Sequence, residues 1–152
     1  MKKFNLLAIA VCGYLLAGCA STPMTSASLD SEAKQFTPEP GKANIYVSRD
    51  SAIIGGILKF QTMLDGRPVG ALAPGTYQLL SVPPGKHTVY ASSEENVQHQ
   101  KVMVEAGKSY FFRVSVTTGW WSGRAFLEPV PEEKQGQKQV LGLKRAEATT
   151  YP

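Results

Sequence analysis

In the central part of the chain, apolar and polar residues alternate with a period of two. The alternation is clearest over residues 109–116, where Tyr110, Phe112 and Val114 share one face and Phe111 lies on the other. Successive side chains of a strand point to opposite faces of its sheet. The pattern therefore predicts a strand with one face in a core and the other toward solvent.

The same pattern recurs in shorter segments that are separated by turn residues. The other segments expected as strands are 44–49, 60–64, 67–72, 76–82, 86–91, 98–105 and 124–130. Asp65-Gly66 is a strong signal for a two-residue hairpin, and Pro68, which has no N–H, places its strand at a sheet edge. About seven short strands with regular turns predict an all-β domain over residues 41–131. We expect an antiparallel β-sandwich of the immunoglobulin or transthyretin kind.

Residues 132–152 are expected to form a helix and a tail. Glu132 and Glu133 would lie in the first helical turn and Lys144-Arg145 in the last, which suits the helix dipole. Two glycines in this segment each weaken a helix by about 1 kcal/mol relative to alanine. The sequence leaves open whether this helix docks on the sandwich.

The start of the chain has a different character. Lys2-Lys3 is followed by an apolar run over residues 6–18 and by the motif Leu16-Ala17-Gly18-Cys19. This arrangement resembles the signal peptide and lipobox of a bacterial lipoprotein. The resemblance implies removal of residues 1–18 and acyl chains such as palmitate on Cys19. The run is shorter than the roughly 20 residues of a spanning helix. The alternative is an ordinary signal peptide that is cut elsewhere.

Three consequences follow from that resemblance. Cys12 leaves with the leader, so the mature chain keeps one cysteine and no internal disulfide is expected. The lipid on Cys19 is the only covalently bound group that we expect. No cofactor is expected. Ala20 resembles the residue found at this position in outer-membrane lipoproteins, so the expected location is the outer membrane, facing the periplasm.

Residues 19–40 are dominated by small and polar residues, with three prolines near their ends. Such a composition predicts a flexible tether with an average span of roughly 25 Å. A short helix over residues 28–36 is the alternative.

Charge gives little support to a nucleic-acid partner. Sixteen Lys and Arg against 12 Asp and Glu give the full chain a net charge of +4. Without Lys2 and Lys3, 14 basic residues against 12 acidic ones leave only +2. The remaining 134 residues, 152 minus 18, suit a single domain with its own core.

Several turn motifs resemble known families. The segments 65–70 (Asp-Gly-Arg-Pro-Val-Gly) and 82–89 (Val-Pro-Pro-Gly-Lys-His-Thr-Val) are similar to the small β-sandwich module named after its Pro-Glu-Gly-Ala motif, although that motif itself is absent. The closer resemblance is to the bacterial lipoprotein family called domain of unknown function 2846, which also shares the Gly-x-x-Tyr-Phe strand at 107–111. This resemblance covers about residues 42–130. It implies the fold and carries no assigned chemistry.

Candidate catalytic and metal-binding residues are few. His87 and His99 are the only histidines, and Glu94, Glu95 and His99 lie in a polar loop and the strand after it. Zinc needs three or four convergent ligands, so no metal site is expected. There is no Gly-x-Ser-x-Gly elbow, and carboxylates paired for glycoside cleavage are not evident. An enzyme is therefore the remote alternative.

Two apolar segments are candidates for binding. In residues 52–58, Ile53, Ile54, Ile57 and Leu58 would either line a buried loop or form an exposed apolar loop.

The second candidate is Trp120-Trp121 between glycines 119 and 123. Adjacent side chains cannot both point inward from a regular strand. The pair would therefore either contact a sugar, lipid or protein partner, or cover the open end of the sandwich.

Together these features predict a membrane-tethered, non-enzymatic β-sandwich that binds another envelope component. A protein partner is favoured over peptidoglycan or polysaccharide. The rival interpretation is a purely structural envelope lipoprotein without a dedicated ligand. An enzyme would instead need a cleft with titratable residues in strained environments.

Overall fold

The computed structural model of the chain describes residues 22–51 and 57–150. The predictions for the leader, Cys12, Cys19, Ala20, Ile53 and Ile54 lie outside the described residues. In the two described ranges, no helix has the length and apolar character needed to cross a bilayer.

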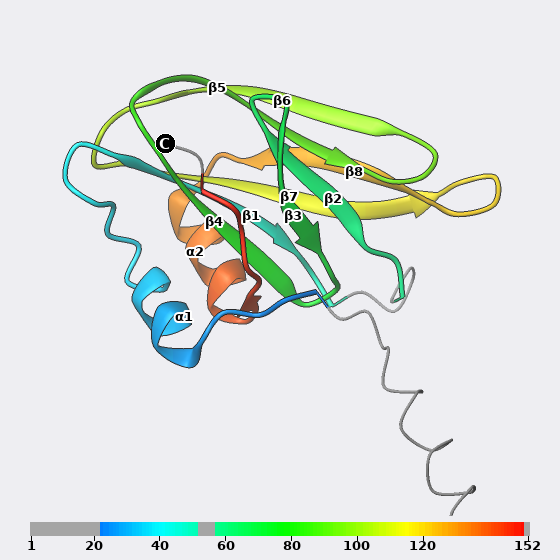
Figure 1. Cartoon of the computed structure of the whole chain (residues 1–152), viewed down its shortest axis with the longest axis horizontal. Helices are drawn as coiled ribbons and strands as arrows, with labels where there is room; N and C mark the ends of the chain where they lie inside the picture. Colours follow the sequence, from blue (N-terminus) through cyan, green and yellow to red (C-terminus); the bar gives the residue numbers. More distant parts are fainter. Residues whose placement is uncertain (1–21, 52–56, 151–152) are drawn as a thin grey trace, which may run out of the picture.

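The described part of the chain forms two helices and nine strands (Figure 1). In chain order they are α1 (Ala27–Ala33), β1 (Ala43–Arg49), β2 (Phe60–Leu64), β3 (Arg67–Leu72), β4 (Thr76–Val82), β5 (Gly85–Ser92), β6 (Val97–Val104), β7 (Ser109–Thr118), β8 (Gly123–Val130), α2 (Glu133–Leu141) and β9 (Lys144–Arg145). β2, β3 and β4 have the predicted bounds, and the other predicted strands differ by one or two residues at their ends.

The strands form two sheets with a shared core, which confirms the all-β sandwich. Sheet one has the order β8-β7-β1-β4-β9, and sheet two has the order β3-β2-β5-β6. Most neighbouring strands are antiparallel, but β1 pairs with β7, and β4 with β9, in parallel. The described strands number nine rather than about seven, partly because residues 144–145, expected in a helix, form β9.

The predicted hairpin and edge strand are both confirmed. Asp65 and Gly66 connect β2 to β3 with φ angles of 52° and 80°, the positive values that a tight two-residue hairpin requires. Pro68 lies in β3, which is at the edge of sheet two. An edge position suits proline because it has no N–H to donate to a further strand.

The main core lies between the two sheets. Ile45 and Val47 of β1 face Phe60, Leu72 and other buried side chains of sheet two in one cluster. Each Val, Leu, Ile or Phe side chain buried in this way contributes about 1.5–3 kcal/mol to stability. The period-two pattern of the sequence therefore identifies the inward faces correctly.

The outer face of sheet one carries a second core, which the sequence pattern did not predict. The rings of Tyr46 and Phe111 stack with centroids 5.0 Å apart, and Ala33 of α1 and Val140 of α2 pack on this cluster. Figure 1 shows both helices on the side of sheet one away from sheet two. The expectation that this face of β7 meets solvent is thus wrong at Phe111, because the two helices cover it.

Gly136 explains how α2 comes close to the sheet. A Cβ atom at this position would lie 2.2 Å from Cγ of Phe111. The glycine lowers the helix propensity of α2, but it permits the close contact between the helix and the aromatic ring.

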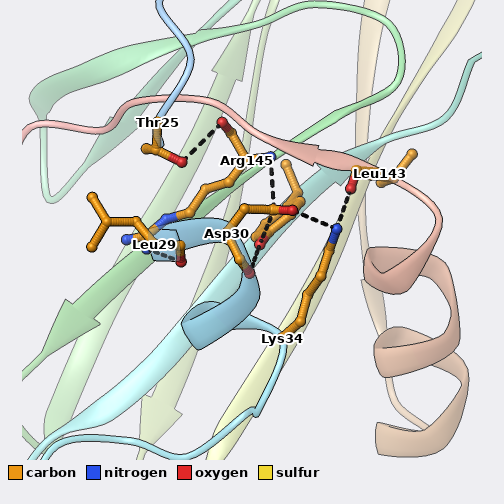
Figure 2. A network of polar contacts seen from close by, with 7 residues as sticks. Thr25, Leu29, Asp30, Lys34, Leu143 and Arg145 are labelled. Atoms are coloured by element: carbon orange, nitrogen blue, oxygen red, sulfur yellow. Dashed lines mark hydrogen bonds and ion pairs between the residues drawn. The ribbon is translucent and has the colours of Figure 1, made fainter. Parts of the chain in front are cut away.

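Residues 22–40 are folded onto sheet one, so the prediction of a flexible tether is wrong for this part of the chain. Asp30 accepts hydrogen bonds from the Tyr77 hydroxyl at 2.8 Å and from the backbone N–H of Arg145 at 3.1 Å. Lys34 pairs with Asp30 at 2.8 Å and donates to the carbonyl of Leu143 at 2.7 Å (Figure 2). The alternative prediction, a short helix over residues 28–36, is close to the observed α1.

The composition of residues 22–40 gave a wrong prediction because the residues that hold this segment in place are distant in sequence. The ring of Phe36 lies 5.4 Å from that of Tyr46, and the Tyr46 hydroxyl donates to the carbonyl of Ala33 at 2.8 Å. Met24 forms an isolated bridge with Ala146. A segment with few apolar residues is thus ordered by one aromatic ring and a small polar network.

The end of the chain also differs from its prediction. α2 ends at Leu141, so Lys144 and Arg145 are not in its last turn; they pair with Thr76 and Tyr77 of β4. The chain then continues toward sheet two, where the N–H of Thr149 donates to the carbonyl of Val69 at 2.8 Å. The C-terminal segment is therefore docked and links the two sheets.

Candidate functional site

The loop between β7 and β8, residues 119–122, is called the tryptophan tip below. Trp120 is 90% exposed and Trp121 is 79% exposed. The alternative prediction, that both rings cover the open end of the sandwich, is therefore wrong. Figure 1 shows the β7–β8 hairpin (yellow to orange) projecting beyond the rest of sheet one.

Glu95, in the turn between β5 and β6, fixes the backbone of this tip. Its Oε2 accepts from the N–H of Trp120 at 2.9 Å, and its Oε1 accepts from the N–H groups of Trp121 at 3.1 Å and Ser122 at 2.6 Å. The bond from Trp120, the further bonds from Ser122 and Trp121 and the charge of Arg124 hold the pKa of Glu95 below its usual range. The indole side chains take no part in these bonds and are exposed.

The turn that carries Glu95 is itself tied to sheet one. The amide of Asn96 donates to the carbonyl of Ala125 at 2.7 Å and accepts from the Ala125 N–H at 2.8 Å. Within the turn, Ser93 Oγ accepts from the N–H groups of Glu95 at 3.1 Å and Asn96 at 3.2 Å. The side chain of Asn96 thus makes with β8 the pair of hydrogen bonds that a neighbouring strand would make. This contact holds the adjacent Glu95 in place opposite the tip.

Gly119 is required by the same arrangement. A Cβ atom at this position would lie 2.2 Å from the carbonyl oxygen of Ser122 and 2.3 Å from Oε1 of Glu95. Real Cβ atoms do not approach so closely, so any other residue would displace either the carboxylate or the loop. The glycine that precedes the tryptophans therefore makes room for their support.

The connection from β1 to β2 reaches the same end of the sandwich. Ile57 is 94% exposed, whereas Leu58 is half-buried and packs on the main core. Ile57 and Leu58 line a hollow of about 270 Å³ together with Ser122 of the tip. The structure thus brings Ile57 and Leu58 to the end that holds Trp120 and Trp121, while Ile53 and Ile54 lie outside the described residues.

Buried Arg49 holds this connection in place. Its guanidinium donates to the carbonyl of Leu58 and, at 3.3 Å, to that of Leu72, and it lies 4.4 Å from the ring centroid of Phe60. Burial lowers the pKa of Arg49. These contacts fix the backbone at Leu58, whose side chain packs on the main core while Ile57 is exposed.

Both histidines contact residues that belong to the framework of sheet two. His87 lies between the carboxylate of Asp65, 2.7 Å from its Nδ1, and the carbonyl of Pro83, 2.8 Å from its Nε2. The ring of His99 lies 5.8 Å from that of Tyr90. The structure leaves these histidines apart from Glu95, and no group of three metal-ligating side chains occurs among residues 22–51 and 57–150.

The Asp65–His87 contact also explains the turn motifs of the sequence. It joins the Asp-Gly hairpin to the Pro-Gly-Lys-His turn, at the end of sheet two opposite the tryptophan tip. Asp65 further accepts from the N–H of Thr88 at 2.7 Å. These motifs therefore specify how the β2–β3 hairpin meets the connection from β4 to β5, which is a role in folding.

Sequence reasoning assigned Glu95 only a weak metal-ligand role and missed its contact with the tip. Glu95 and Trp120 are 25 residues apart and belong to connections of different sheets. Only the glycine at position 119 hinted that something must approach the loop closely.

Two comparisons with known proteins show which family the chain belongs to. The family described as "Protein of unknown function (DUF2846)" matches residues 39–128, from just before β1 into β8. A protein of Haemophilus influenzae, described as "Uncharacterized protein", is 36% identical over 133 residues, which cover 87% of this chain and 78% of that protein. The family match covers more than half of the chain and includes both Asp65 and His87. This chain belongs to the family of proteins of unknown function DUF2846.

Proposed function

We propose that this protein is a non-enzymatic binding domain of the bacterial cell envelope, anchored to a membrane by lipid on Cys19. In this proposal, the tryptophan tip contacts another envelope component. The observation that carries it is the exposure of both indole rings on a loop whose backbone is fixed by Glu95.

Both the hydration of the indole rings and the order of the loop backbone favour binding by the tip. Two adjacent indole rings in water form a large apolar surface, and burying it against a partner is favourable. Tryptophan is among the residues that most often dominate the energy of protein interfaces. Because Glu95 and Asn96 already fix the loop, binding would require little further loss of backbone entropy.

The chemistry around the tip supports binding rather than catalysis. The carboxylate of Glu95 is engaged by three backbone N–H groups, which lower its pKa and make it a poor general base. The Glu95 carboxylate is thus used to hold the loop. The largest exposed side chains of the loop are the two indole rings.

The anchor in this proposal comes from the lipobox resemblance at Leu16–Cys19. Labelling with radioactive palmitate tests it, with Cys19→Ser as the matched control. Incorporation into the wild-type chain and its loss in Cys19→Ser are expected. An unlabelled wild-type chain would remove the anchor from the proposal.

Contact by the tip is tested in living cells with a photo-cross-linking side chain. We would replace Trp121 by p-benzoylphenylalanine and, as a control, place the same group at Met103, which is 64% exposed in β6. Adducts with protein or lipid from position 121 and none from position 103 are expected. Equal or absent adducts would favour the purely structural lipoprotein.

A further inference from the structure

The described chain begins in a docked segment rather than in a tether. Thr22 is only 5% exposed, and the carbonyl of Pro23 accepts from the N–H of Glu147 at 2.8 Å. Cys19 precedes Thr22 by three residues, which span at most about 11 Å when fully extended. A lipid on Cys19 would therefore hold the surface around Thr22 close to the bilayer.

That surface lies level with the second half of β1, whose end points toward the tip. Met24 bridges to Ala146, whose N–H donates to the carbonyl of Tyr77, and Tyr77 pairs with Ser48 near the end of β1. β7 runs parallel to β1 and continues past this level into the tryptophan tip. In the view of Figure 1, the start of the described chain (dark blue) overlaps the end of β1, and the β7–β8 hairpin projects farther to the right.

We infer that the tryptophan tip, with Ile57 beside it, enters the interfacial layer of the same bilayer that holds the lipid on Cys19. The domain would then rest on the membrane at two places, the acylated N-terminus and the tip. This inference rests on the proposed function, because it requires the lipid anchor. It also names the envelope component that the tip contacts.

The side chains of the tip suit such a layer. Indole rings concentrate at membrane–water interfaces because their bodies are apolar and their N–H groups are polar. Ile57, which is almost fully exposed at the same end, adds an aliphatic side chain. The positive charges of exposed Lys59 and Arg124 are balanced by the negative charges of Glu94 and Glu95. The contact would therefore depend mainly on apolar groups rather than on attraction to anionic lipid.

The backbone of the tip is also prepared for a less polar medium. The N–H groups of Trp120, Trp121 and Ser122 are already bonded to Glu95, so moving the loop out of water would not leave them without partners. The sequence alone favours a protein partner. The short reach from Cys19 favours the lipid surface, because it holds the domain close to the bilayer.

The test uses the acylated protein, purified with its own lipid and reconstituted in vesicles of phosphatidylethanolamine and phosphatidylglycerol. Trp120 and Trp121 are the only tryptophans of the chain, so intrinsic emission reports on the tip alone. Bromine atoms on the lipid acyl chains quench indoles in the membrane, whereas iodide quenches indoles in water. We expect bromolipids to reduce the emission roughly twofold and iodide to have little effect, as for interfacial tryptophan.

A matched control moves the fluorophore to the opposite end of the sandwich. The variant Trp120→Phe/Trp121→Phe/Met103→Trp places a single indole near the far end of β6, where Met103 pairs with Lys86. Its emission should be quenched by iodide and not by bromolipids. Equal bromolipid quenching in both proteins would overturn the inference, because the tip would then have no special position.

Flotation of the vesicles separates failure of the inference from failure of the proposed function. Protein that floats with a tip accessible to iodide would refute the inference and leave the lipid anchor intact. Protein that does not float would refute both. A tip that is accessible in pure lipid but shielded in native envelope membranes would assign the contact to a protein partner, again overturning the lipid assignment.

Discussion

Glu95 Oε2 accepts a hydrogen bond from the backbone N–H of Trp120 across 2.9 Å, and this contact joins the β5–β6 turn of sheet two to the β7–β8 loop of sheet one. The exposed rings are thus carried by a loop that is held from the opposite sheet.

Removal of the carboxylate should loosen the tip without unfolding the domain. In Glu95→Ala, the three N–H groups of the loop lose their acceptor and turn to water, so the steady-state fluorescence anisotropy of the two tryptophans should fall. The neighbouring Glu94→Ala is the control because Glu94 is exposed and lies in the same turn. Equal anisotropy in wild type and Glu95→Ala would contradict the proposed support.

Gly119→Ala should disturb the same contact by steric overlap. The added methyl group would lie within 2.3 Å of both the Ser122 carbonyl and Glu95, so we expect a loss of about 1–3 kcal/mol in the free energy of unfolding. Chemical denaturation measures this loss.

Gly142→Ala is the matched control for that substitution. Its Cβ would meet its nearest neighbour at 3.7 Å, and its φ is an ordinary −81°. Its stability should stay within about 1 kcal/mol of the wild type. Similar losses in both variants would argue against a tight fit at Gly119.

The indole rings themselves should matter little for folding. Because both are exposed, Trp120→Ala/Trp121→Ala should lower the free energy of unfolding by no more than about 1 kcal/mol. The same variant should lose its contact with the envelope partner. Thermal unfolding followed by circular dichroism decides the first point. A loss of several kcal/mol, as for core aromatics, would contradict it.

The docking of α1 should depend on pH through Asp30. Burial by itself would raise the pKa of Asp30, but bonds from Lys34 and Tyr77, the Lys34 charge and the Arg145 N–H outweigh it and hold the pKa below its usual range. Because the folded-state pKa is depressed, this contribution is complete above roughly pH 5 and is lost as the pH falls through the ordinary aspartate range toward the lower folded-state value.

Hydrogen exchange of the α1 amides, followed as the pH is lowered, measures this effect once intrinsic rates are corrected. Asp30→Asn should abolish most of the pH dependence and reduce stability by about 1–3 kcal/mol. Glu32→Ala, an exposed change in the same helix, should stay within about 0.5 kcal/mol of the wild type. An unchanged pH profile in Asp30→Asn would refute the role of this carboxylate.

The strands could be predicted from sequence because alternation is local and sets which side chains face the core. The alternation rule could not decide whether both tryptophans are exposed, since it only forbids both from pointing inward from a regular strand. It also misread Phe111, because the helices that cover it come from residues 27–33 and 133–141, far away in the chain. The docking of Asp30 and the support by Glu95 depend on contacts across 47 and 25 residues, respectively, which no local pattern records.

Tryptophan emission of residues 20–152, prepared without leader or lipid, tests most directly the claim that the tip is an exposed, ready-made contact surface. The only two fluorophores of this kind are Trp120 and Trp121. We predict red-shifted emission that iodide quenches readily in the folded protein. Blue-shifted emission protected from iodide would show that the rings are buried and would contradict the claim.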